Sequence, residues 1–208
     1  VVADLNAIEG RVAAWVAGEQ WKLDAYARGE DLYVLSYAAS FGKRPEDVTP
    51  DERQIGKVEE LALGFGGAAG AFGTMSEAYG VAMHPDKVTE VVRAWRRANP
   101  KIVQFWWDLE RAVISITTSA EAVIKLGALQ ILKSGAWLRI ILPSGRSLSY
   151  AQPKIEDGQF TYMGPHHYTR KWGRISSYGG KLFENCLGAN TEILTLYGWK
   201  RIIYLRED

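Results

Sequence analysis

Apolar residues recur at helical spacing through the first part of the chain. Three such runs cover residues 6–18, 21–28 and 31–41, and each predicts a helix with one apolar face. A fourth helix is expected to begin at Pro50, because Thr49 is a favoured N-cap residue and proline suits the first helical position. The first half of the chain is therefore predicted to be mainly helical.

Glycine and proline set the breaks in this pattern. The segment GFGGAAGAFG, residues 64–73, has too many glycines for a helix interior, so a helix is not expected there. Residues 74–118 look mostly helical again, with breaks expected at Gly80, Pro85 and Pro100.

The pattern changes near Glu121, where short β-rich segments separated by glycine and proline predict strands. These segments are AVIKL, LQILK, WLRIIL and SLSYA. A short helical run, KLFENC, then precedes the strand-like segments TEILT and KRIIYL, and residues 1–3 read as another short buried strand. This order predicts an α+β fold in which a helical block is inserted into a sheet domain.

The composition is typical of a packed globular protein and does not indicate what the protein binds. The 208 residues suit one large or two small domains, and 47% of them are hydrophobic. The formal net charge of +1 neither favours nor excludes a nucleic-acid partner. A single cysteine cannot form an intramolecular disulfide, so a reducing cytoplasm is expected, and no apolar run predicts a membrane span. Both ends look cut, which indicates a piece of a longer protein.

Two places carry candidate chemistry. Asp4 stands where the first predicted strand ends, and strand exits often present functional carboxylates, although a helix cap is the alternative. The fourth predicted helix carries residues spaced four apart, which share one face: Arg53, Lys57, Leu61 and Phe65. The cations of this face can hold a polyphosphate and its apolar end a flat base, whereas the alternative is an ordinary amphipathic surface.

Two segments that hold these residues are VVADLNAIEGR and RQIGKVEELALGFG. The first resembles motif A and the second motif B of the family A DNA polymerases, and the glycine-rich region looks most like phage and prophage members. Further resemblances follow family order across residues 1–185, in DAYARGEDLYVLSYAA, NPKIVQFWWDLERA, LPSGRSLSY and YGGKLFEN. The resemblance implies a partial right-hand polymerase, with palm strands and a mainly helical fingers insertion at roughly residues 34–135.

The resemblance also implies roles for individual residues in adding deoxynucleotides to a primer 3′ end. Asp4 and the main-chain carbonyl of Leu5 would bind two Mg²⁺ ions, which activate the primer hydroxyl and stabilise the leaving pyrophosphate. Primer–template DNA and deoxynucleoside triphosphates are the implied partners. The other implied roles are a steric gate against ribonucleotides for Glu9, triphosphate binding for Arg53 and Lys57, proximity to the templating base for Phe65, and a DNA backbone contact for Arg146.

The chain departs from the family pattern at several points. Leu61 stands where a stacking aromatic is usual, so part of about 1–3 kcal/mol of base stacking is expected to be lost. Tyr33 stands where the family often has a histidine that contacts phosphate. Its hydroxyl can still donate a hydrogen bond, but it has no positive charge. The family's second catalytic aspartate, in a His-Asp-Glu turn, is not found in the sequence, and the three histidines, His84, His166 and His167, are expected at the surface. One carboxylate is a poor site for two Mg²⁺ ions, so this chain alone is expected to be inactive.

The single cysteine, Cys186, begins a segment that resembles the first block of inteins, CLGANTEILTLYGWKRI. The resemblance implies that residues 186–208 form the β-hairpin of an intein start, split or truncated. The Cys186 thiol would then attack the Asn185 carbonyl to give a thioester. A C-terminal polymerase and intein portion, in cis or in trans, would be a further partner. The alternatives are that Cys186 is a buried helix residue, or that the chain is a non-catalytic nucleic-acid-binding polymerase remnant.

Overall fold

The computed structural model describes residues 7–81, 83–119, 122–166, 169–186, 192–195 and 198–201. The chain divides into two compact units, one of residues 7–105 and one that begins at Trp106. Asp4, Leu5 and the strand predicted at residues 1–3 lie outside the described residues.

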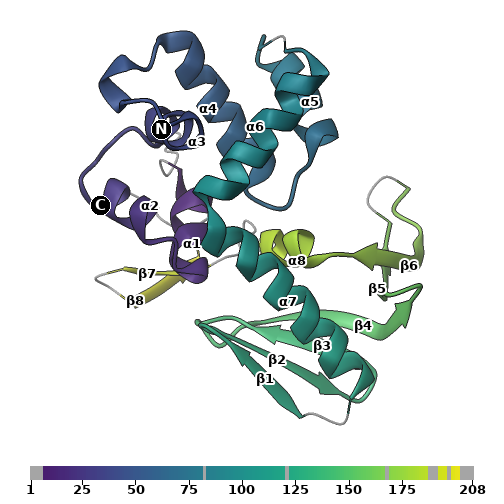
Figure 1. Cartoon of the computed structure of the whole chain (residues 1–208). Helices are drawn as coiled ribbons and strands as arrows, with labels where there is room; N and C mark the ends of the chain where they lie inside the picture. The colour runs from purple at the N-terminus through teal and green to yellow at the C-terminus, as the bar shows by residue number, and fades with distance from the viewer. Residues whose placement is uncertain are drawn as a thin grey trace. The chain divides into compact units, whose positions relative to one another are not determined.

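The first unit is a cluster of helices (Figure 1). Its elements are α1 (Ile8–Ala17), α2 (Gln20–Ala27), α3 (Leu32–Phe41), the 3-10 turn η1 (Pro45–Asp47), α4 (Pro50–Leu63), α5 (Ala69–Ala78), α6 (Pro85–Ala98) and the start of α7 (Pro100–Thr118). The helices predicted from the apolar spacing are confirmed to within two residues at their ends, and the predicted breaks at Pro85 and Pro100 are the first residues of α6 and α7.

Local sequence signals set several of the helix ends. Gly18 ends α1 in the left-handed conformation, with φ 72°, which glycine adopts without steric cost. At the start of α4, Thr49 and Glu52 form a capping box, and Pro50 occupies the first helical turn as predicted. A hydrogen bond from Lys43, together with those from Thr49, lowers the pKa of Glu52 to about 2.

The prediction that the glycine-rich segment forms no helix was wrong at its C-terminal end. Helix α5 begins at Ala69 and contains Gly70 and Gly73. Each glycine costs a helix interior about 1 kcal/mol relative to alanine. The side chain of Phe72, between them, is fully buried, and burying a phenylalanine is worth about 1.5–3 kcal/mol. Tertiary burial therefore offsets the poor helix propensity.

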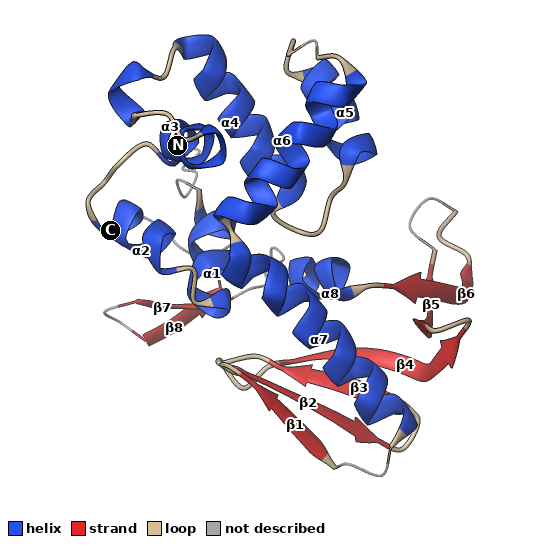
Figure 2. Cartoon of the chain, viewed as in Figure 1, coloured by secondary structure: helices blue, strands red, loops and turns tan. Residues whose placement is uncertain are grey.

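The second unit is built on a six-stranded antiparallel sheet whose strands lie in sequence order (Figure 2). The strands are β1 (Val123–Leu126), β2 (Leu129–Ser134), β3 (Trp137–Ile141), β4 (Ser147–Glu156), β5 (Gln159–Pro165) and β6 (Trp172–Ser177). The first four correspond to the predicted strands. The last two were missed, although Asp157-Gly158 between alternating apolar residues is a strong signal for the hairpin that joins β4 to β5.

Helices complete the core of the second unit. The later part of α7 contributes Leu109, Val113 and Ile116, which are all fully buried. Helix α8 (Gly179–Cys186) starts against α7, because the Gly179 N–H donates to the Glu110 carboxylate at 3.1 Å. The described chain ends with a separate two-stranded antiparallel hairpin, β7 (Glu192–Thr195) and β8 (Gly198–Arg201).

These elements confirm the predicted mixed α+β class, with a helical first half followed by a sheet. None of the helices within the described residues combines the length and apolar character that crossing a membrane requires.

Candidate functional site

A close approach of α3 and α4 brings together residues that the sequence singled out. Gly56 of α4 lies directly against the backbone of α3, where an added Cβ would overlap the carbonyl oxygen of Tyr33. The two helix backbones can approach this closely only because residue 56 has no side chain. Tyr33 therefore contacts α4 at the residue that precedes Lys57 and lies three positions after Arg53.

The charged groups of Arg53 and Lys57 each lie over an aromatic ring of the first unit. The Arg53 guanidinium lies 5.2 Å from the centre of the Tyr33 ring, and its Nε lies 2.6 Å from Asp31 Oδ2. The Lys57 ammonium lies 4.7 Å from the centre of the Tyr79 ring. Both are cation–π distances, and such stacking orients a cation while leaving its outer side open to an anion.

The predicted set of Arg53, Lys57, Leu61 and Phe65 is here called the α4 face. The opposite side of the helix buries Gly56, Val58, Glu59 and Leu63. Leu61 is 39% exposed, and Arg53, Lys57 and Phe65 are half-buried. The structure thus places Arg53, Lys57 and Leu61 on one accessible side of α4, whereas Phe65 lies two residues beyond the helix, which ends at Leu63.

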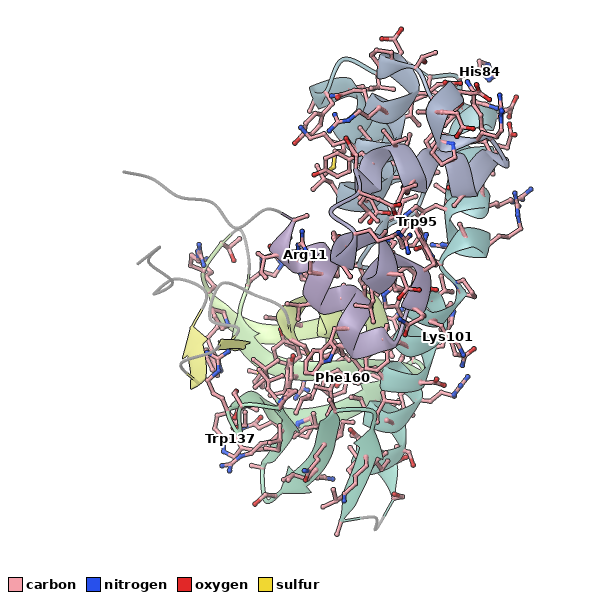
Figure 3. The ribbon with its side chains drawn as sticks, turned by 90° about the vertical axis from the view of Figure 1, so that its left-hand side faces the viewer. Arg11, His84, Trp95, Lys101, Trp137 and Phe160 are labelled. Atoms are coloured by element: carbon pink, nitrogen blue, oxygen red, sulfur yellow. The ribbon has the colours of Figure 1, made fainter. Side chains whose placement is uncertain are left out.

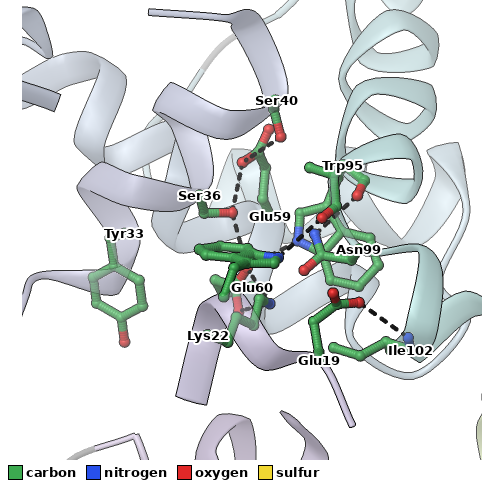
Figure 4. Close-up of polar contacts among 12 residues, drawn as sticks. Glu19, Lys22, Tyr33, Ser36, Ser40, Glu59, Glu60, Trp95, Asn99 and Ile102 are labelled. Atoms are coloured by element: carbon green, nitrogen blue, oxygen red, sulfur yellow. Dashed lines mark hydrogen bonds and ion pairs between the residues drawn. The ribbon is translucent and has the colours of Figure 1, made fainter. Parts of the chain in front are cut away.

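A buried polar cluster lies beneath the α4 face, and the sequence analysis missed it (Figure 4). The ammonium of Lys22, which is 1% exposed, lies 2.6 and 2.8 Å from the two carboxylate oxygens of Glu60. Trp95 Nε1 donates to Glu60 Oε1 at 2.9 Å, and the Ser36 hydroxyl lies 2.8 Å from the same oxygen. Glu60 is therefore held by side chains from α2, α3 and α6.

Glu59, the neighbour of Glu60, is fully buried, and this burial raises the pKa of its carboxyl to about 8. Glu59 Oε2 lies 3.0 Å from the Ser36 hydroxyl and 3.4 Å from the Ser40 hydroxyl. At neutral pH the carboxyl is protonated, so it can donate to Ser36 while the Ser36 hydroxyl donates to Glu60. These bonds fix the rotation of α4 about its axis, and so the direction in which Arg53 and Lys57 project.

Helix α1 carries two further residues of the motif A resemblance. Glu9 lies exposed in its first turn. The Arg11 guanidinium lies 4.3 Å from the centre of the Tyr26 ring. Burial raises the pKa of Tyr26, and the nearby Glu60 raises it further, so this hydroxyl stays neutral.

Arg146 and Cys186 belong to the second unit. Arg146 lies in the loop between β3 and β4, where its carbonyl accepts from the Leu142 N–H at 2.8 Å. Cys186 is the last residue of α8 and is 3% exposed, and its thiol donates to the Leu182 carbonyl at 3.2 Å. Burial raises the pKa of the Cys186 thiol to about 12. In this conformation the thiol is neither ionised at neutral pH nor accessible.

The expected metal site falls outside what the structure describes, because Asp4 and Leu5 are not among the described residues. Within the described ranges, no three or more histidine, cysteine, aspartate or glutamate side chains group together as a metal site would require. His84 is exposed and accepts a hydrogen bond from the Asp86 N–H as the N-cap of α6.

The known proteins that are similar to this chain belong to one class of protein. No known family model matches the chain. The whole chain is similar to the DNA polymerase of Bacillus phage SP02, at 39% identity over an alignment of 223 residues, gaps included. This alignment covers 34% of the phage protein. About half of the chain, 52%, is similar to DNA polymerase I of Aquifex aeolicus (strain VF5), at 29% identity over 109 residues or 19% of that protein.

The chain is therefore homologous to DNA polymerases, a bacteriophage polymerase and a DNA polymerase I among them. It spans about a third of the phage relative and a fifth of the bacterial one. The alignment with the phage polymerase takes in the entire chain, so it does not set residues 186–208 apart from the rest.

Proposed function

We propose that the chain is part of a template-directed DNA polymerase and that the α4 face binds the incoming deoxynucleoside triphosphate. The observation that carries this is the placement of Arg53 and Lys57 one turn apart on the accessible side of α4. Two cations at this spacing suit the oxygens of a triphosphate. Leu61, one turn further along α4, and Phe65, two residues beyond its end, would then pack against the bases.

Other residues take supporting roles in this proposal. Tyr33 backs the Arg53 guanidinium and offers a phenolic donor to a phosphate oxygen. Glu9 crowds the sugar 2′ position and so favours deoxynucleotides. Arg146 contacts the DNA backbone.

The described residues do not supply a set of ligands for two Mg²⁺ ions. Asp4 with the carbonyl of Leu5 would provide one carboxylate, and a two-metal site needs more oxygen ligands than these. The metal-binding role of Asp4 therefore depends on polymerase sequence beyond this chain, and primer extension is expected only when that portion is supplied.

Equilibrium binding tests the nucleotide assignment without requiring catalysis. The affinity for a fluorescent dATP analogue is measured by anisotropy for the wild type, Arg53→Ala and Lys57→Ala. Each change removes a charge-assisted hydrogen bond worth about 1.5–3 kcal/mol, so about 10- to 100-fold weaker binding is expected. Lys87→Ala is the control, since Lys87 is an exposed lysine of α6 in the same unit. Equal affinity in all four proteins would refute the assignment.

A second proposal is that Cys186 starts an intein. The β7–β8 hairpin, which follows Cys186 in the chain, supports it. The Cys186 sulfur would attack the Asn185 carbonyl carbon, the Asn185–Cys186 amide bond would break, and the freed Cys186 nitrogen would take the thiol proton. Because the thiol is buried in α8, the end of this helix must open first.

Mass spectrometry tests this second proposal. Incubation with excess dithiothreitol should release a fragment of residues 1–185 by attack on the thioester, and Cys186→Ala should abolish this release. Wild-type protein that stays intact in dithiothreitol, alone and with a matching C-terminal intein half, would rule the proposal out.

A further inference from the structure

The sheet of the second unit has two faces of different character. One face packs against the core and buries Leu129, Ile131, Leu138 and Ile140, each at most 1% exposed. Side chains alternate between the two faces of a strand, so the residues between these four point the other way. The residues of this second face, here called the outer face, are Val123, Lys125, Gln130, Leu132, Trp137, Arg139 and Ser149.

Strand register shows that the outer face is continuous across β1–β4. Leu132 pairs with Val123 on one side and with Arg139 on the other, and Arg139 pairs in turn with Ser149. Trp137 lies two residues before Arg139 on the same strand, so the indole and the guanidinium are neighbours on one face. Lys125 lies in the adjacent row, opposite Gln130.

The segment that forms the outer face is strongly basic, unlike the chain as a whole. Between residues 122 and 155 the sequence has no aspartate or glutamate and five basic residues, Lys125, Lys133, Arg139, Arg146 and Lys154. This is a charge of +5 on 34 residues, whereas the formal net charge of all 208 residues is +1. Of these five, Lys125 and Arg139 lie on the outer face, and no carboxylate of this segment offsets their charge, which makes the face complementary to a polyanion.

The exposure of Trp137 indicates which kind of polyanion the outer face suits. It is 41% exposed, whereas Phe160 of the same sheet is fully buried (Figure 3). Arg139 is exposed next to it on β3, and Lys125 is exposed two strands away on β1, and neither forms an ion pair with another described residue. An accessible indole beside such a guanidinium can stack on an unpaired base while the two cations contact phosphates of the same strand. Paired bases of a duplex do not offer a free ring face in this way.

We propose that the outer face binds single-stranded DNA, with one base stacked on Trp137 and phosphates on Arg139 and Lys125. Identifying this strand as the template rests on the proposed polymerase function, whereas the binding itself does not. The face lies entirely within the second unit and shares no residue with the α4 face.

The test is the affinity of the full chain for a fluorescein-labelled oligothymidine, measured by anisotropy over a range of salt concentrations. Trp137→Ala should weaken binding about 5- to 100-fold, because the base would have no ring to stack on. In Lys125→Ala/Arg139→Ala the slope of log affinity against log salt should fall by about 0.7 for each phosphate that the protein no longer neutralises.

Two control variants separate the outer face from general surface charge and exposed aromatic area. Lys133→Ala removes a lysine of β2 that points to the other side of the sheet, where its ammonium lies 3.1 Å from the Thr117 carbonyl. Trp172→Ala removes a tryptophan of β6 that is 66% exposed. Both variants should bind the oligonucleotide as the wild type does.

Unchanged affinity and salt slope in the outer-face variants, or no binding by the wild type, would overturn the proposal. Equal losses in the two control variants would overturn it as well, because binding would then be a diffuse property of the surface. Arg53→Ala separates this proposal from the nucleotide assignment, since it should leave oligonucleotide affinity unchanged whether or not it weakens nucleotide binding.

Discussion

Replacing Glu59 by glutamine should change how the stability of the protein depends on pH. Burial raises the pKa of the Glu59 carboxyl from an ordinary 4.5 to about 8, and the neighbouring Glu60 charge acts in the same direction against hydrogen bonds from Ser36 and Ser40. Between these two pH values the folded protein holds a proton that the unfolded chain has lost. The free energy of unfolding therefore falls as pH rises through this window, by up to about 1.4 kcal/mol per pH unit.

Urea unfolding of the wild type and Glu59→Gln at several pH values between 5 and 8 measures this effect. A glutamine does not titrate, so any constant cost of the substitution cancels from the comparison. The stability of the variant relative to the wild type should rise by about 2.5 kcal/mol between pH 5 and pH 7. Glu77→Gln, at an exposed position of α5, should show no such trend. Parallel pH curves for the wild type and Glu59→Gln would mean that Glu59 is ionised in the folded protein, contrary to this reasoning.

Four further outcomes follow from the local geometry. Gly56→Ala should push α3 and α4 apart and lower both stability and nucleotide affinity, because the new methyl group would overlap the Tyr33 carbonyl. Gly73→Ala, in a helix with open space around it, should instead stabilise the protein by up to about 1 kcal/mol, measured with Gly56→Ala by urea unfolding. Thr49→Ala should cost about 1 kcal/mol in urea unfolding through loss of the capping box, and an unchanged midpoint would contradict this. The thiol of Cys186 should react with Ellman's reagent only after denaturant is added, and stoichiometric reaction of the native protein within minutes would show that it is accessible.

Sequence patterns predicted those parts of the fold that depend on interactions between residues close together in the sequence. The end of α1 at Gly18 and the start of α4 at Thr49-Pro50 follow from local capping chemistry. The helix over Gly70 and Gly73 could not be predicted this way, because the burial of Phe72 by distant residues overrides local propensity. The missed strand β5 is different, since Asp157-Gly158 is a local signal for the hairpin that joins β4 to β5.

The candidate site shows the same division between local and distant information. Four-residue spacing was enough to place Arg53, Lys57 and Leu61 on one face, because helix geometry fixes that relation. The cluster beneath them joins Lys22 to Glu60 across 38 positions, and spacing carries no information about such a pair. The adjacent residues Glu59 and Glu60 inside a helix did indicate a buried carboxylate. Glu59 falls on the side of α4 that also buries Val58.

The most direct test of the central claim compares dATP with deoxyadenosine as ligands in isothermal titration. If Arg53 and Lys57 hold the triphosphate, the wild type should prefer dATP by at least about tenfold, and Arg53→Ala/Lys57→Ala should lose most of that preference while its affinity for deoxyadenosine changes little. The same preference for dATP in the wild type and the double variant would contradict the account, because the triphosphate would then be bound elsewhere.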